Sequence, residues 1–357
     1  MAWDNNKLKK QLQEFKLAFS SSEDKEFKKI AKYDYNVIYE MLKSQDSTLE
    51  ELDKDLLCQK DEYIDNYSDF LNESFEQLIA NKRIFFELSK LMEHLVYKNS
   101  KMFPNRSIPF FKLIEMDKEF LAFFNPFLYE LMVNNLDEHV EFFKFRNNKS
   151  TLNKLGLCYP IFSINESFIS IDMRRKGNFD VLPHELAHSE EFFIIDEFAN
   201  HLCWKVSSFV ESYPNFVALA FCDYFENSEY GDLCLEKKQL FFDSIKVMME
   251  TYIYHISCMK DFDIKKNKII LENNTTISKK EIDYLISSFM SIYMLYLYNN
   301  ETEEFGIFIK KYHSFIGKSD KEIWGLIDFE KLLIAIQNES TRLNESITLS
   351  RKRTKNF

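Results

Sequence analysis

The sequence predicts a mostly α-helical protein with one small β-hairpin or sheet. Glycine and proline are scarce, with six of each in 357 residues, so sharp turns must be few and long helices are favoured. From residue 7 to about residue 97, apolar residues recur at spacings of three and four, which is typical of amphipathic helices. One stretch, Gly156 to Met173, alternates apolar and polar residues as strands do.

The first part of the chain is predicted to form a helical region of its own. All six glycines lie beyond residue 155, so helices joined by polar caps are expected here. The clearest loop runs from Met102 to Pro109, because proline removes a backbone donor and restricts the residue before it. We therefore expect an N-terminal helical region at residues 1–105 and a second region, which carries the chemistry, at residues 106–357.

The alternating stretch predicts a hairpin. Its two apolar arms are Ile161–Ile164 and Phe168–Ile171, and the polar pair Asn165–Glu166 forms the turn between them. The chain beyond Asp180 is predicted to be helical again. The expected helices include residues 216–225, 236–260 and 278–298.

Charge and composition exclude several classes of partner. The formal net charge is -11 and the isoelectric point about 5.3, which disfavours binding to the phosphates of nucleic acids. The longest uncharged run, Tyr284–Asn300, contains polar residues and is shorter than the ~20 apolar residues of a membrane span, so a buried helix is expected. The six cysteines form no Cys-x-x-Cys pair and the chain opens without a signal pattern, so a cytoplasmic location is expected.

The segment His184-Glu185-Leu186-Ala187-His188 carries a metal-site pattern. Two histidines four residues apart on a helix share one face, so their imidazoles can converge on one ion. Zinc lowers the pKa of water, and the adjacent Glu185 can take the water proton and pass it to a leaving amine. Asp180 is expected to cap this helix, with Pro183 in its first turn. The pattern predicts Zn2+ on His184 and His188, with Glu185 as general base.

A catalytic zinc site needs a third protein ligand and an open position. Glu197 is the preferred candidate on the sequence, and the other two are Asp196 and His201. Glu197 lies nine residues after His188, so an unbroken helix would turn it to the opposite face. We therefore expect the helix to bend between Ser189 and Phe193.

Around this motif the sequence resembles the oligoendopeptidase F and thimet oligopeptidase group of zinc peptidases. The similar segments are, in chain order, Gly156-Leu157-Cys158-Tyr159, Phe168–Asp172, Asp180–Pro183 and His184–His188. The resemblance covers the chain from about Gly156 to its end. It implies a zincin-like metallopeptidase fold, short peptides as substrates, and the third zinc ligand at Glu197. In that family the ligand follows the second histidine by roughly two dozen residues.

The same family has a late helix in which a histidine is followed by several tyrosines that stabilise the oxyanion. Ser288–Tyr298 is similar to this helix, with Ser288 at the histidine position and Tyr296 and Tyr298 at tyrosine positions. The resemblance implies that Tyr296 or Tyr298 donates to the oxyanion, a contribution of ~3 kcal/mol per donor. We also expect an edge strand at Phe168–Ile171 that can pair with an extended peptide.

These patterns predict a zinc-dependent metalloendopeptidase of the oligopeptidase type, and three alternatives stay open. Ser288 and the short path to Glu197 favour a catalytically weakened pseudo-peptidase that binds zinc. Glu197–Asn200 also fits a regulatory metalloprotease of the repressor-cleaving kind, although the acidic charge and the tyrosine-rich helix argue against it. A helical interaction protein without metal is the third alternative.

Overall fold

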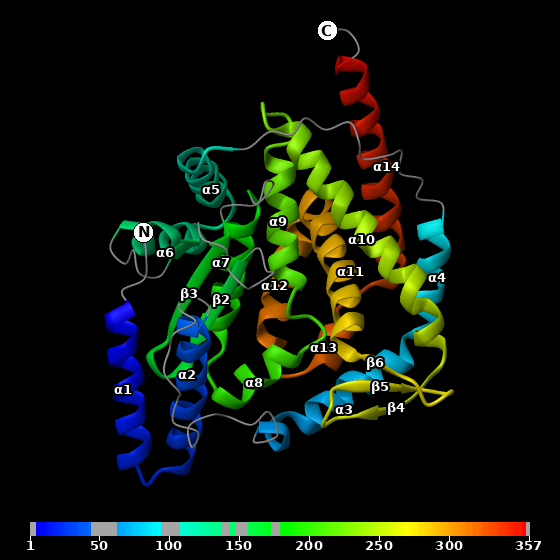
Figure 1. Cartoon of the computed structure of the whole chain (residues 1–357). Coiled ribbons are helices and arrows are strands. Elements are labelled where there is room, and N and C mark those ends of the chain that lie inside the picture. Colours follow the sequence, from blue (N-terminus) through cyan, green and yellow to red (C-terminus); the bar gives the residue numbers. More distant parts are fainter. Residues whose placement is uncertain are drawn as a thin grey trace. The chain divides into compact units, whose positions relative to one another are not determined.

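The computed structural model describes residues 5–43, 63–93, 108–137, 143–146, 156–172 and 179–354. Helices dominate this part of the chain, as predicted, and Figure 1 labels them together with most of the strands. The chain divides into two compact units. The first comprises Met1–Glu62 and Ser107–Phe198, and the second Tyr63–Arg106 and Ala199–Phe357. The expected division at residue 105 stays a prediction, and in the structure each unit takes a segment from both sides of that position.

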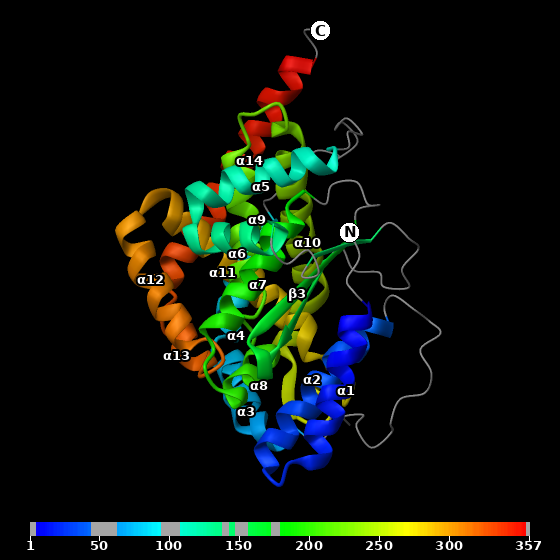
Figure 2. The ribbon, with the colours of Figure 1, turned by 90° about the vertical axis from the view of Figure 1, so that its left-hand side faces the viewer.

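The first unit places helices around a small sheet. Its elements are α1 (Asn5–Ser21), α2 (Lys25–Lys43), α5 (Phe110–Phe124), α6 (Pro126–Asp137), β1 (Phe143–Arg146), β2 (Gly156–Ile161), β3 (Glu166–Asp172) and α7 (Val181–Ile194). The helices α1 and α2 pack side by side (Figure 2). The helix α7 packs along β2 and β3 (Figure 1). The helix with the two motif histidines is therefore supported by the sheet.

The predicted hairpin is confirmed, with shifted boundaries. The strand β2 pairs antiparallel with β3, but it ends at Ile161, and Phe162–Ile164 forms a 3-10 turn. Asn165 closes this turn at φ 50°, a left-handed conformation that asparagine tolerates better than most residues. The strand β1 pairs parallel with the other side of β3. The expected edge strand at Phe168–Ile171 is therefore wrong, because β3 is central and β2 lies at an edge.

A buried carboxylate anchors the hairpin turn to α2. Asp34 is fully buried, and its two oxygens accept hydrogen bonds from the backbone amides of Phe162 and Ser163 at 2.8 and 2.7 Å. Hydrogen bonds to a charged acceptor contribute more than neutral ones, about 1.5–3 kcal/mol each. This contact fixes the end of β2 next to α2.

The second unit is mostly helical and has a sheet of its own. Its elements are α3 (Ile64–Ala80), α4 (Lys82–Glu93), α8 (Phe198–Val206), α9 (Ser212–Tyr224), α10 (Gly231–Ser257), β4 (Met259–Asp263), β5 (Lys268–Leu271), β6 (Thr276–Ser278), α11 (Lys279–Asn300), α12 (Thr302–Phe315), α13 (Asp320–Trp324) and α14 (Phe329–Thr354). The helix α8 begins at the last residue of the first unit. The strands β4, β5 and β6 form an antiparallel meander that the sequence did not predict.

The uncharged run Tyr284–Asn300 lies in α11, which is buried along most of its length, as expected. This helix packs against α9 and α14 within the second unit. None of the described helices combines the length and the apolar character that a bilayer crossing requires. The cysteines of the described residues are free thiols.

Candidate metal centre

The motif lies on a helix, as predicted, and this helix, α7 (Val181–Ile194), is unbroken. His184 and His188 project from the same face one turn apart, with ring centroids 5.0 Å from each other and ring planes at 82°. Asp180 occupies the N-cap position, but its side chain makes no capping hydrogen bond, so the expected cap is wrong in this respect. Pro183 lies in the first turn, where a missing backbone donor costs little.

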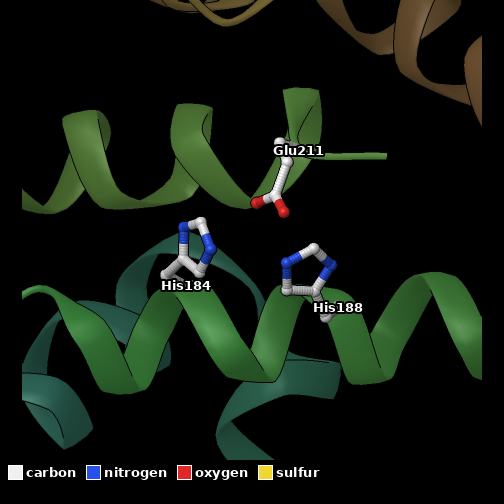
Figure 3. Close-up of side chains that lie close together, drawn as sticks. All are labelled: His184, His188 and Glu211. Carbon is white, nitrogen blue, oxygen red and sulfur yellow. The ribbon is translucent and has the colours of Figure 1, made fainter. Parts of the chain in front are cut away.

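A third ligand-bearing side chain lies with the two histidines. One ligand atom from each of His184, His188 and Glu211 can be chosen so that all lie within 4.8 Å of one another, and no other such group occurs among the described residues. Figure 3 shows the Glu211 carboxylate directed toward the two imidazoles. Glu211 immediately precedes α9, and its own carbonyl accepts the Asn215 amide at 3.1 Å in the first turn of that helix.

The three ligand candidates from the sequence are not members of this group. The expected bend between Ser189 and Phe193 is wrong, because α7 continues to Ile194. The chain turns only after that residue, and Asp196 and Glu197 are exposed in the turn. The role of Glu197 as third ligand stays a prediction, with Glu211 as its competitor.

His201, the remaining candidate, is fully buried on α8 and packs against Trp204, with ring centroids 5.6 Å apart. Burial, and then the positive charge of Lys205, lower the pKa of His201 well below its usual range. The imidazole is therefore neutral at physiological pH, and it acts here as part of the core.

Glu211 was missed because sequence reasoning stopped at the first acidic residues after the motif. Glu211 lies 23 residues after His188 (211 − 188), which is close to the spacing of roughly two dozen residues that the family resemblance implies. A search for an acidic residue at that spacing, in place of the nine residues that separate Glu197 from His188, would have indicated Glu211.

Glu185 is buried between α7 and the edge strand β2, with 6% of its surface exposed. The backbone of Gly156 passes so close that a Cβ atom there would overlap Glu185 Oε1, and it would lie 2.5 Å from Val181 Cγ1 and 2.8 Å from Glu185 Cγ. Only glycine fits this position without displacing a neighbour. The strand therefore confines the Glu185 side chain from one side.

Buried hydroxyls join α7 to the same sheet. Ser167 on β3 donates to Ser189 Oγ at 2.8 Å, and Ser189 donates to the carbonyl of Glu185 at 3.3 Å. On another side of the helix, the Asn125 amide donates to both oxygens of Glu190 at 3.0 Å. These bonds fix the rotation of α7 about its axis, and with it the direction of the motif side chains.

The tyrosines implied by the resemblance lie on α11. Tyr298 is half-buried and packs edge-on against Phe216 and Phe305, at centroid distances of 5.8 and 5.4 Å. Burial, and then the negative charge of Asp223, raise the pKa of the Tyr298 hydroxyl. Tyr296 is also half-buried, and its carbonyl accepts from Asn300 at 2.8 Å. Their role at an oxyanion stays a prediction.

Asp117 on α5 is a buried acid whose oxygens have no hydrogen-bond partner among the described residues. Burial, and then the negative charge of Asp180, raise the pKa of Asp117 well above its usual range. Above pH ~3.9 the unfolded chain binds fewer protons at this residue than the folded chain. The contribution of Asp117 to the free energy of unfolding therefore falls as pH rises.

We expect the Asp117→Asn variant to lose less stability than the wild type between pH 4 and pH 7. In the wild type, one proton retained by the folded chain changes the free energy of unfolding by up to ~1.4 kcal/mol per pH unit. Urea unfolding at several pH values measures this difference. Glu115→Gln, at an exposed site on the same helix, is the control and should leave the slope unchanged. Parallel pH profiles for Asp117→Asn and the wild type would contradict the prediction.

The fold and site together define a mostly helical protein with a His-Glu-x-x-His helix supported by a small mixed sheet. Comparisons of the chain with protein-family models, curated proteins and solved structures found no match. The resemblance to the oligoendopeptidase F and thimet oligopeptidase group therefore stays a prediction, as do the zincin-like fold and the activity that it implies.

Proposed function

We propose that the chain is a zinc-dependent metallopeptidase that hydrolyses short peptides, with His184, His188 and Glu211 as metal ligands. The observation that carries the proposal is the grouping of these three side chains, and the buried Glu185 follows His184 directly in the chain. Two imidazoles and one carboxylate form a donor set that suits zinc. These three side chains would hold the ion, since one ligand atom from each lies within 4.8 Å of the others.

Each residue then has a distinct task. When bound, zinc supplies Lewis acidity that polarises a carbonyl and lowers the pKa of water. Glu185 accepts the proton of the attacking water and delivers it to the leaving amine. The strand β2 confines the Glu185 carboxylate and limits its contact with bulk water.

The edge strand β2 supplies a site for the peptide backbone. Among the described strands it pairs only with β3, and an extended peptide is proposed to add as a further strand along its other edge. Pro160 has no backbone donor, so pairing is expected along the part of β2 from Gly156 to Tyr159. A peptide that paired there would have its backbone near Glu185, because Gly156 lies against that side chain.

The experiment that tests the proposal is peptide cleavage by the zinc-loaded chain. The protein is stripped with a chelator, reloaded with one equivalent of zinc, and incubated with a mixture of short peptides that is read by mass spectrometry. We expect cleavage only in the zinc-loaded sample. Stoichiometric zinc without cleavage of any peptide would overturn the peptidase proposal.

A zinc-binding pseudo-peptidase is the second candidate, and Ser288 favours it. At the position where the resemblance implies a histidine, the Ser288 hydroxyl donates to the carbonyl of Tyr284 on its own helix at 2.7 Å. It therefore uses its donor within α11. Bound zinc without turnover would select this candidate over the active peptidase.

We expect Gly156→Ala to lower kcat by about 10- to 100-fold while zinc content stays at one per chain. The added Cβ must push the Glu185 carboxylate away, and a misplacement of about 1 Å in a catalytic group costs rate on this scale. Steady-state kinetics with zinc analysis checks both halves of the prediction. Gly306→Ala is the matched control, because a Cβ at Gly306 meets nothing within 4 Å. Equal kcat values for the two variants would contradict the prediction.

A further inference from the structure

The turn that leads into Glu211 is held by buried side chains from several other helices of the second unit. Ser207 Oγ and Ser208 N donate to the two carboxylate oxygens of Asp320, at 2.6 and 3.0 Å. Ser74 on α3 also donates to Asp320, at 2.7 Å. Asp320 is the first residue of α13 and is fully buried. One carboxylate therefore fixes two successive residues of the turn.

A second set of bonds comes from α11 and converges on Ser208. The Ser208 hydroxyl donates to Asp283 Oδ1 at 2.7 Å, and Lys279 Nζ contacts both groups, at 3.1 and 2.7 Å. Ser287 donates to the carbonyl of Ser208 at 2.9 Å. The side chain and backbone of Ser208 are thus both fixed.

The last anchor lies two residues before Glu211. The fully buried Tyr312 on α12 donates its hydroxyl to the carbonyl of Phe209 at 3.0 Å, and the amide of Ser212 donates to the same carbonyl at 2.9 Å. The backbone is therefore held on both sides of Glu211. Within the second unit these bonds restrain the backbone from which the Glu211 side chain projects.

Burying these charged groups is energetically unfavourable, so we expect the geometry that they fix to serve a function. Lys279 and Asp320 are fully buried, and burial raises the pKa of Asp283 while Lys279 opposes that rise. Removing charged groups from water is unfavourable unless ion pairing and hydrogen bonds compensate for it. By contrast, the connection between α3 and α4 closes through local bonds at Asn81, whose amide donates to the Gln77 carbonyl at 3.0 Å. A turn that only joins two helices needs no buried charges.

We propose that Asp320, Lys279 and Tyr312 are positioning residues that hold Glu211 in place as a metal ligand. The inference rests on the proposed zinc site, and it concerns how the chain positions the third ligand. A ligand that is held in place loses less conformational freedom when the ion binds, so metal affinity depends on these distant side chains. Removing groups that orient a ligand typically costs 10- to 100-fold in metal affinity.

The test compares Tyr312→Phe and Lys279→Met with the matched control Lys238→Met. Lys238 is buried like Lys279, and its ion-pair partners Asp223 and Glu339 lie outside the turn before Glu211. Three quantities are measured: the zinc dissociation constant by competition with a chromophoric chelator, the visible spectrum of the Co2+-substituted protein, and urea unfolding of the metal-free protein. The first two report ligand geometry, which a loss of stability alone does not change.

We expect Tyr312→Phe and Lys279→Met to weaken zinc binding about 10-fold or more and to alter the Co2+ spectrum. Lys238→Met should lower stability and leave both metal readouts as in the wild type. Should Lys279→Met not fold, Tyr312→Phe decides, since it removes a single hydroxyl. Unchanged zinc affinity and Co2+ spectrum in Tyr312→Phe, or equal effects from Lys238→Met, would overturn the inference.

Two further measurements separate this inference from the proposed function. A wild-type chain that takes up no zinc removes the proposed site and the inference with it. If the wild type and Glu211→Gln bind zinc equally well, Glu211 is not a ligand and the positioning inference is wrong. The two histidines then remain as ligands.

Discussion

The Glu185→Gln variant is expected to keep one zinc per chain and to lose peptidase activity by about 100- to 10,000-fold in kcat. Glutamine has nearly the shape of glutamate, so it fills the buried space beneath Gly156 without steric change. It cannot accept the proton of the attacking water, so the general base is lost. Steady-state kinetics on a cleaved peptide, together with zinc analysis of the same sample, measures both outcomes.

Glu190→Gln is the matched control for this variant. Glu190 lies on the same helix and is held by the Asn125 amide at 3.0 Å, outside the group of ligand-bearing side chains. Its replacement should leave kcat within a few-fold of the wild-type value. Peptide cleavage by Glu185→Gln at the wild-type rate would remove Glu185 from the mechanism.

The second large effect concerns the metal itself. His184→Ala, His188→Ala and Glu211→Gln are each expected to weaken zinc binding by more than 100-fold, because each removes a ligand rather than a group that orients one. Glu197→Gln is expected to bind zinc like the wild type, since Glu197 is exposed in the turn after α7. Competition with a chromophoric chelator gives the four dissociation constants.

The pair Glu197→Gln and Glu211→Gln decides between two assignments of the third ligand. Loss of zinc from Glu211→Gln alone supports the group drawn in Figure 3. Loss of zinc from Glu197→Gln alone supports the assignment that the sequence resemblance implies, and it contradicts ours. Circular dichroism on each variant shows whether it retains its helices, so a metal loss through unfolding is recognised.

The helices and the motif could be predicted because their signals are local. The apolar spacing of three and four predicted helices over residues 7–97, and α1 to α4 lie in the described part of that range. The uncharged run Tyr284–Asn300 lies in α11. The motif histidines are four residues apart, which fixes their shared face on any helix. The hairpin was predictable for the same reason, from alternation around the polar pair Asn165–Glu166.

The second sheet was not predictable from hydrophobic periodicity. Its strands are only three to five residues long, and β4 (Met259–Asp263) contains three charged residues. The available signals were turn residues: Asn267 and Asn274 adopt φ values of 50° and 62°, and asparagine is one of the few residues that accept this conformation. Such asparagines mark the two turns of the meander.

The third metal ligand could not be fixed from the sequence because it depends on long-range packing. Nothing local to Glu211 distinguishes it from the other acidic residues of the chain. Its place is set by Asp320 and Tyr312, which lie about a hundred residues further along the chain. Only the spacing of 23 residues from His188 pointed to it, and only through the resemblance.

The most direct test of the zinc site is a crystal structure of the zinc-loaded chain at a wavelength that identifies zinc. We expect one zinc ion per chain, with a nitrogen of His184, a nitrogen of His188 and a carboxylate oxygen of Glu211 each at ~2.0–2.2 Å. The carboxylate of Glu185 should lie near the open position without binding the ion. Zinc held by other residues, or a loaded crystal without zinc on the two histidines, would contradict the site proposed here.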